Sequence, residues 1–423
     1  MKSVAMLALL TFAATCAAQN PCVPGAVPQA AQQATFAQAE LRKASYEEMD
    51  TKIPAATSTH TRELKDALTR TADAAFACAG SDANPATLQD TLAKALHANP
   101  PQPPGNTAIQ NNDPRYTEVL GSYGHNLLVQ VSRPTNVSGL IAVQFSINIE
   151  CGNDNMLLVY ALRDGSWKRQ LRWQANKLDQ ISDAFGDFFL TAFLPGQNGS
   201  WRLAVAHGTP WCTSRFSVFD IDVLAPGSSA DVPRIVWHMR RDYSLGDAEI
   251  TLKANGNTFD LRLNADEMEF VETSSERRVI YRYQVTDNGV QRIGPIANHA
   301  RGFVEEWISA PWEESRNLTA SENISDLEKV HDELNPPIKP DDKQFLSHGS
   351  GPVRACTTPG VFQVEMSSVL ETSVPGKSAM DSKGLPSRYF HIREGKDGYT
   401  MLSAPIQPDP TCTGPDLMHS AGN

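Results

Sequence analysis

Hydrophobic and polar positions follow two different periods along this chain, and the first is helical. Between residues 28 and 98 apolar side chains recur every three or four positions, which predicts amphipathic helices. The clearest helix has Asn84 as its N-cap and Pro85 in its first turn. Another helix stops at Gly80, and an alanine-rich one covers about residues 29 to 49. The chain therefore begins with a helical segment.

From about residue 116 the period becomes 2, which is typical of β-strands. Runs rich in Val, Phe and Tyr alternate with turn dipeptides such as Asp164-Gly165 and Asn255-Gly256, the pattern of antiparallel hairpins. The runs form three successive groups of four. The predicted strands are 127–131, 140–149, 156–162 and 166–173 in the first group, 187–194, 201–206, 216–224 and 234–239 in the second, and 249–254, 259–263, 279–286 and 290–296 in the third.

A glycine followed by His or Asp opens each group. The three dipeptides are Gly124-His125, Gly186-Asp187 and Gly246-Asp247. The two intervals between these glycines are nearly equal, and a regular period of this kind indicates a repeated supersecondary unit. Four short antiparallel strands per unit are typical of a propeller blade, and a β-sandwich with evenly spaced hairpins is the alternative. The predicted fold is mainly β with helical segments: an N-terminal helical bundle, then the propeller-like repeat.

Helical spacing returns after the third group. Its apolar face consists of Phe303, Val304, Trp307, Ile308 and Trp312, and the pairs Glu305-Glu306 and Glu313-Glu314 are predicted on the opposite face. A strand predicted at 361–366 then indicates a fourth, less regular β unit. These patterns divide the chain into a signal peptide at 1–18, a helical segment at 19–98, a proline-rich linker at 99–107, a β-repeat domain at 108–300, a helical insertion at 301–334 and a C-terminal β segment with a disulfide at 335–423.

The N-terminus, as far as Ala18, has the pattern of a secretory signal peptide. Lys2 supplies the charge, residues 4–14 form the apolar run, and small residues from Cys16 to Ala18 mark the cleavage point. The apolar run is too short to span a bilayer. Acylation of Cys16 is an alternative, but the residues before it fit a lipidation motif poorly. Soluble export, to a periplasm or outside the cell, is the favoured prediction.

Cysteine usage agrees with export. Cleavage after Ala18 removes Cys16 and Lys2, so the seven cysteines become six and the net charge goes from -11 to -12. An even count in an exported chain favours disulfides. Proline-rich runs separate the six cysteines into sequential pairs, the preferred connectivity among the 15 that are possible. The predicted pairs are Cys22–Cys78, Cys151–Cys212 and Cys356–Cys412.

Composition and motifs narrow the function classes. The acidic balance disfavours nucleic acid and anionic membranes as partners. The sequence contains no nucleophile elbow, no His-Glu-x-x-His, no phosphate-binding loop, no Cys-x-x-Cys and no EF-hand loop, which disfavours catalysis by the familiar routes.

The repeat supplies the best candidate site. If each glycine dipeptide opens the inner strand of a blade, then His125, Asp187 and Asp247 surround one mouth of the repeat. One imidazole and two carboxylates there would hold a divalent cation or a polar ligand. In the competing interpretation, an aspartate after a glycine ends a turn and accepts hydrogen bonds from backbone N–H groups. No other cofactor is indicated.

The helical insertion supplies a second candidate. Its two glutamate pairs, flanked by Trp307 and Trp312, have the residue types of a glycosidase acid and base with a sugar-stacking platform. The competing interpretation is structural. Consecutive glutamates diverge by about 100° around a helix, and the tryptophans lie on the face that packs.

The helical segment offers one resemblance. Two helices around a central proline, with Cys78 closing the second, resemble the small lysozyme-inhibitor-type helical domains of bacterial envelopes. The resemblance is confined to this short segment and is carried by Leu41, Tyr46 and Cys78. It implies a helical module with an inhibitor-like role.

The predicted function is an exported, disulfide-stabilised binding or assembly protein of the bacterial envelope or the extracellular space, without catalysis. Repeated β platforms present loops to partners, and no nucleophile–base pair is evident in the sequence. The expected partner is an extracellular glycan or protein. The alternatives are an extracytoplasmic hydrolase acting on glycan or peptide, and the lysozyme-inhibitor-like module.

The cysteine pattern gives a direct prediction. Each sequential disulfide would close a loop of roughly 60 residues, which stabilises the fold by a few kcal/mol in the chain-entropy model. Non-reducing peptide mapping is expected to recover a peptide that links Cys151 to Cys212. A peptide linking Cys212 to Cys356 would contradict the sequential pairing.

Overall fold

The computed structural model shows three N-terminal helices followed by four four-stranded antiparallel sheets, and in every sheet the strands follow sequence order. This confirms the predicted mainly β fold with a repeated four-stranded unit. The structure describes residues 22–43, 54–98, 124–149, 152–174, 189–196, 199–209, 216–244, 250–267, 275–286, 289–337, 344–372, 381–396 and 398–418.

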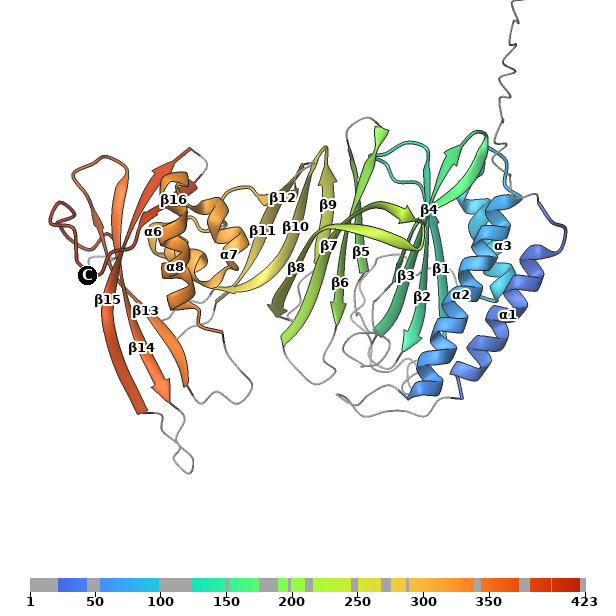
Figure 1. Ribbon diagram of the computed structural model, residues 1–423, viewed down its shortest axis with the longest axis horizontal. Helices are drawn as coiled ribbons and strands as arrows, with labels where there is room; N and C mark the ends of the chain where they lie inside the picture. Colours follow the sequence, from blue (N-terminus) through green and yellow to red (C-terminus); the bar gives the residue numbers. More distant parts are fainter. Residues whose placement is uncertain are drawn as a thin grey trace, which may run out of the picture.

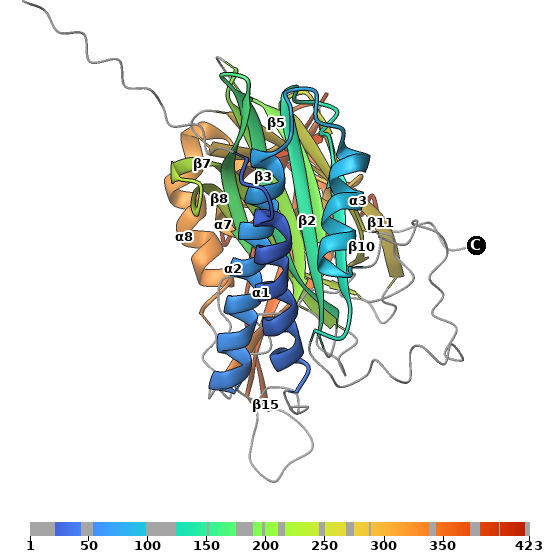
Figure 2. The same ribbon diagram turned by 90° about the vertical axis from the view of Figure 1, so that its right-hand side faces the viewer.

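Three helices precede the first sheet, and they cover one of its faces (Figure 2). They are α1 (Ala26–Leu41), α2 (Ala55–Ala77) and α3 (Pro85–Leu96). The predicted cap of α3 is present, because the Asn84 side chain accepts a hydrogen bond from the backbone N–H of Ala86 at 2.8 Å. Leu88, Leu92 and Leu96 form its buried stripe, as the helical spacing predicts.

The first three sheets repeat one unit. Their first strands begin at Leu127, Phe189 and Thr251, which are equally spaced along the chain. Sheet 1 comprises β1 (Leu127–Ser132), β2 (Leu140–Ile149), β3 (Gly152–Arg163) and β4 (Ser166–Gln174). Sheet 2 comprises β5 (Phe189–Pro195), β6 (Trp201–Thr209), β7 (Phe216–Ser229) and β8 (Val232–Ser244). Sheet 3 comprises β9 (Thr251–Asn255), β10 (Thr258–Glu267), β11 (Ser275–Thr286) and β12 (Gly289–Arg292).

Turn chemistry fixes the strand register within a unit. Between β3 and β4, Asp164 and Gly165 both have positive φ, at 50° and 77°. A two-residue hairpin with two positive φ angles matches the twist of its strands, and Asp-Gly is a preferred sequence for it. The predicted turn is therefore confirmed.

The first three sheets stack face to face in a row (Figure 1). One face of sheet 1 packs on the helices, and the other face packs on sheet 2. The opposite face of sheet 2 packs on sheet 3. Sheets pack face to face both in a propeller and in a sandwich, so this packing agrees with both predicted alternatives. The row of sheets in Figure 1 is open and does not close into a ring.

The far face of sheet 3 is polar at its centre. Asp260 on β10 forms a two-pronged ion pair with Arg282 on β11, with Oδ1–Nε at 2.7 Å and Oδ2–Nη2 at 2.8 Å. The Arg282 side chain is half exposed. A polar outer face is what the last unit of a stacked repeat requires, because no further unit covers it.

The helical insertion and the fourth sheet form the other end of the row (Figure 1). The insertion contains α6 (Ala300–Ser309), α7 (Trp312–Ser315), α8 (Ile324–Leu334) and two short 3-10 turns, η2 (Arg316–Leu318) and η3 (Ser321–Asn323). Sheet 4 comprises β13 (Gln344–Ala355), β14 (Val361–Thr372), β15 (Asp381–Gly395) and β16 (Gly398–Ser403). Trp307 is fully buried between the helices and sheet 4, which confirms that it is a packing residue.

Two of the three predicted disulfides are present. Cys22 is bonded to Cys78 and Cys356 to Cys412, each with a sequence separation of 56. The third predicted pair, Cys151 and Cys212, lies outside the described residues. The first bridge ties the chain before α1 to the C-cap of α2, and the second ties the C-terminal segment to sheet 4.

A buried ion pair joins the helices to sheet 1. Lys65 on α2 and Asp154 on β3 approach to 2.7 Å, and their side chains are 0% and 1% exposed. Burial raises the pKa of Asp154, although the neighbouring Lys65 charge opposes this effect. The helices and sheet 1 therefore share one core, with a charged contact as well as apolar packing.

This ion pair gives the second prediction. Lys65→Ala leaves the Asp154 carboxylate buried without its partner, which costs about 3–5 kcal/mol. Replacing both residues, Lys65→Met with Asp154→Leu, removes the charges together and is expected to restore most of that loss. Guanidinium unfolding of the three proteins measures both effects. A double variant as unstable as Lys65→Ala would show that the apolar packing around the pair, rather than the unpaired charge, sets the loss.

Candidate functional site

Of the three residues predicted to surround one mouth of the repeat, only His125 can be placed. It is exposed and lies two residues before β1. Asp187 and Asp247 lie outside the described residues, so their meeting with His125 stays a prediction. Gly124 has φ 70°, and its carbonyl accepts hydrogen bonds from Gln38 Nε2 at 2.8 Å and Arg42 Nε at 3.0 Å. This first glycine therefore anchors the end of α1 beside sheet 1.

Two of the four glutamates in the insertion take part in buried ion pairs, which favours the structural interpretation of these residues over a glycosidase acid and base. Glu306 and Glu314 both pair with the buried Arg292 of β12. Glu306 also accepts a hydrogen bond from Ala297 N at 2.7 Å, and Glu314 accepts one from the Tyr283 hydroxyl at 2.7 Å. Through these ion pairs and hydrogen bonds the two carboxylates hold the insertion against sheet 3. The shared partner Arg292 lies on a strand of another unit, so helical spacing alone gave no sign of it.

Sheet 2 brings together four side chains that the sequence analysis did not combine. This imidazole–carboxylate cluster consists of His207 on β6, Asp220 and Asp222 on β7, and His238 on β8. Asp222 Oδ1 lies 2.8 Å from His238 Nδ1, and Asp222 Oδ2 lies 3.6 Å from His207 Nε2. His238 Nε2 lies 3.8 Å from Asp220 Oδ1, beyond hydrogen-bond distance. One carboxylate is thus placed between two imidazoles.

Strand alternation explains why these residues share a face. In β7, Ile221 and Val223 point into the core with sheet 3, so Asp220 and Asp222 point toward sheet 1. The register places Asp222 opposite His238 and Asp220 opposite His207. The Asp222 side chain is 10% exposed, whereas that of His238 is 54% exposed. The cluster therefore has a buried anchor and an exposed ring.

Aromatic and polar groups of sheet 1 border the cluster. Trp173, at the end of β4, lies with its ring centroid 4.8 Å from that of His207 and 4.9 Å from that of Phe189. On the neighbouring strands, Ser146 donates to Asn155 Oδ1 at 2.6 Å. The interface between sheets 1 and 2 is apolar along most of its length and becomes polar at this end.

The charge of Asp222 is stabilised in place. Burial raises its pKa, but the nearby His207 ring and the hydrogen-bonded His238 ring together outweigh burial, and the net pKa of Asp222 lies below the usual range. Asp222 is therefore ionised at neutral pH and fixes the orientation of the His238 ring. A carboxylate that orients an imidazole in this way is found in binding sites and in general-base dyads.

The register of the β7–β8 hairpin is the sequence signal that could have placed Asp222 beside His238. A turn centred on Ala230 and Asp231 brings Asp222 opposite His238 across the hairpin. His207 has no such local signal, because β6 and β7 are joined by a longer segment. Spacing along the chain gave His238 no metal-ligand partner, since its partners lie across strands.

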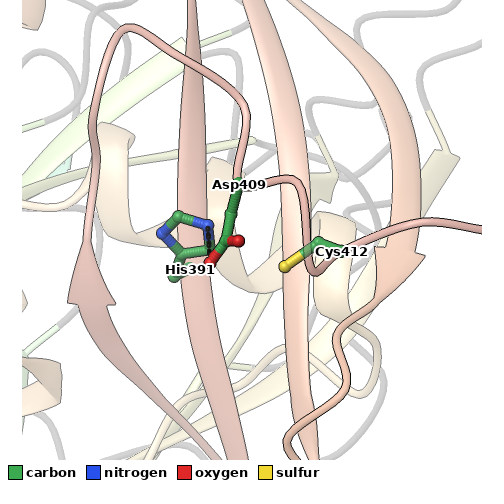
Figure 3. Close-up of side chains that lie close together, drawn as sticks. All are labelled: His391, Asp409 and Cys412. Atoms are coloured by element: carbon green, nitrogen blue, oxygen red, sulfur yellow. Dashed lines mark ion pairs between the residues drawn. The ribbon is translucent and has the colours of Figure 1, made fainter.

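A second cluster lies on sheet 4, against the C-terminal segment (Figure 3). His391 on β15, Asp409 and Cys412 each offer one ligand atom, and these atoms all lie within 4.8 Å of one another. Cys412 is bonded to Cys356, so its sulfur is a disulfide sulfur rather than a thiolate. Burial lowers the pKa of His391, and backbone and side-chain hydrogen bonds from Thr411 lower the pKa of Asp409.

Comparisons with known proteins leave these clusters as the main guide to function. No model of a known protein family matches the chain, and no curated protein sequence matches it. Among the described helices, none combines the length and apolar character needed to cross a membrane.

The pKa of Asp222 gives the third prediction. A carboxyl whose folded pKa is lowered stabilises the fold above its unfolded value of about 3.9, and this contribution is lost as the pH falls through the folded pKa. Asp222→Asn is therefore expected to cost about 1.5–3 kcal/mol at pH 6, the range for a hydrogen bond to a charged group, and less at pH 3. Urea unfolding at the two pH values measures the difference.

The control for this prediction is Asp326→Asn, which removes an exposed carboxylate beside Lys329. Because exposed ion pairs contribute little to stability, this variant is expected to be near neutral at both pH values. An Asp222→Asn penalty that is equal at both pH values would contradict the assignment.

Proposed function

We propose that this protein is an exported, disulfide-stabilised binding protein whose imidazole–carboxylate cluster contacts a hydroxyl-rich ligand of the glycan class. One observation carries the proposal: buried Asp222 holds the ring of His238, and that ring is more than half exposed. A ring fixed in this way binds a ligand without first losing rotamer freedom. The role in the envelope or outside the cell is binding or assembly.

The chemistry of the cluster favours hydroxyl groups as the ligand. Imidazole nitrogens act as donors or acceptors, and the carboxylates of Asp220 and Asp222 accept hydrogen bonds. Asp220 Oδ1 is buried without a hydrogen-bond partner among the described residues. The exposed ring of His238 is the accessible contact for a ligand hydroxyl, and a phosphate or another anion would be repelled by both carboxylates.

Export is supported by two independent features. The N-terminal residues have the charge, apolar run and small residues of a signal peptide. Two disulfides occur among the described cysteines, and disulfides persist in oxidising compartments. The net charge of -11 supports a partner other than nucleic acid.

A hydrolase is the second candidate, and the same pair of residues favours it. An imidazole whose Nδ1 is held by one carboxylate, Asp222, and whose Nε2 lies beyond hydrogen-bond distance of the other, Asp220, has the arrangement of a general base. In that role His238 would take a proton from water attacking a bound glycan or peptide bond. Glu306 and Glu314 of the insertion do not support this candidate, because Arg292 pairs with them.

The fourth prediction tests the proposal with a glycan array. Wild-type protein is expected to bind a defined subset of the glycans saturably and to leave them intact. His238→Ala and Asp222→Asn are expected to weaken binding at least about tenfold, since each removes a charged or oriented hydrogen-bonding group. The released solution is analysed by mass spectrometry for cleaved glycan, which would favour the hydrolase.

The control is His60→Ala. His60 is a partly exposed imidazole whose Nδ1 lies 3.0 Å from Glu63 on α2, so it matches the His238 arrangement in a different part of the molecule. This variant is expected to bind like the wild type. If all three variants bind equally well, the ligand does not bind at the cluster on sheet 2. If the wild type binds no glycan, the ligand is not a glycan.

A further inference from the structure

The ligand set at the C-terminal disulfide has the composition of a metal site. His391 and Asp409 lie beside Cys412, and Cys412 is bonded to Cys356. Two thiolates, one imidazole and one carboxylate are ligands that Zn²⁺ takes in tetrahedral sites. Cys356 directly follows β13, His391 lies on β15, and the other two belong to the C-terminal segment, so no short motif marks them in the sequence.

The disulfide and a metal ion cannot use these sulfurs at the same time. Zinc requires thiolates, and two thiolates at about 2.3 Å from one tetrahedral ion lie nearly 4 Å apart. Bonded sulfurs are about 2.05 Å apart and carry no thiolate charge. The covalent bond and the metal site are therefore alternative states of one pair of cysteines.

The remaining ligands are already oriented. His391 Nδ1 lies 2.9 Å from Ser403 Oγ, so Nε2 points to the other side of the ring, where it lies 3.3 Å from Gln363 Oε1 and near Asp409. A metal ion at Nε2 would replace the contact with Gln363. Asp409 Oδ1 accepts from the backbone N–H of Thr411 at 2.8 Å, and Asp409 Oδ2 lies 4.0 Å from His391 Nε2. Outer hydrogen bonds of this kind fix the ring and the carboxylate in metal sites.

The backbone near both cysteines is held without the disulfide. Cys356 N donates to Val361 O at 2.9 Å, and Thr357 N donates to Thr411 O at 3.1 Å. Further along, Leu417 N donates to Val353 O at 2.8 Å. These contacts keep the C-terminal segment on sheet 4 when the S–S bond is broken.

We propose that Cys356, Cys412, His391 and Asp409 bind one Zn²⁺ when the Cys356–Cys412 disulfide is reduced. A phosphine or dithiol supplies two electrons, and two protons from solvent convert the S–S bond into two thiols while the reductant is oxidised. Zinc then displaces both thiol protons. Oxidation by a disulfide reverses the exchange, removing two electrons and releasing the ion. The proposal stands independently of the glycan assignment.

The test is zinc binding by the full mature protein, oxidised or reduced with a phosphine under argon. Dialysis against Zn²⁺ followed by elemental analysis is expected to find one more zinc per chain in the reduced wild type than in reduced His391→Ala. Both reduced proteins contain the same free thiols, so the difference isolates this site. The oxidised wild type and oxidised His391→Ala are expected to bind equal amounts of zinc.

The matched control is His348→Ala. His348 on β13 lies in the same sheet with Nδ1 2.9 Å from Ser368 Oγ, and burial lowers its pKa as it does that of His391. This variant keeps the extra zinc. Ser403→Ala, which removes the hydrogen bond to His391, is expected to weaken zinc binding about tenfold.

A spectroscopic measurement guards against variants that fold poorly. Co²⁺ added to the reduced wild type is expected to give thiolate-to-metal charge-transfer absorption and the intense visible bands of a tetrahedral site. Zinc is expected to raise the melting temperature of the reduced wild type and not of the oxidised protein. Equal zinc content in reduced wild type and reduced His391→Ala, or reduced protein without the cobalt bands, would overturn the proposal.

Discussion

The architecture depends on covering every apolar sheet face. Sheet 1 and sheet 2 are apolar on both faces, so each face requires a packing partner. Sheet 2 packs between sheets 1 and 3, and the N-terminal helices cover the face of sheet 1 that points away from sheet 2. The buried Lys65–Asp154 pair makes this junction selective, because a misplaced helix would bury a charge without its partner. Sheet 3 is the last of the three repeated sheets, and its far face carries the polar pair Asp260 and Arg282. The repeated unit is stable only as part of this stack.

Much of this fold could be predicted from local pattern. The hairpin turns, the regular spacing of the units, the Asn84 cap and the buried Trp307 all follow from neighbours in sequence, and the structure contains them. Two of the sequential disulfides also follow. The local sequence pattern did not predict which distant residue each buried polar group pairs with. Glu306 and Glu314 resembled exposed helix residues because Arg292, which neutralises them, lies on a strand of another unit.

The same limit applies to the sites. His238 and Asp222 are 16 residues apart and meet through a hairpin whose register includes a bulge, so neither helical nor strand spacing placed them together. His391, Asp409 and Cys412 meet because the C-terminal segment returns to sheet 4. A chain that stacks similar sheets can carry different chemistry on each one. Here sheet 2 presents imidazoles and carboxylates, whereas sheet 4 carries an imidazole and a carboxylate beside a disulfide.

Strand order within the sheets has a consequence for how the chain folds. Every sheet is a meander in which each strand pairs with its neighbours in sequence, so most pairing closes short loops. Low contact order favours rapid folding, and each unit can form as soon as its own four strands are available. The exception is the docking of α2 on β3, which are far apart in sequence, so this contact must wait for the first sheet. We therefore expect the slow kinetic phase of refolding to report the helix junction, with the remaining sheets condensing onto it in turn.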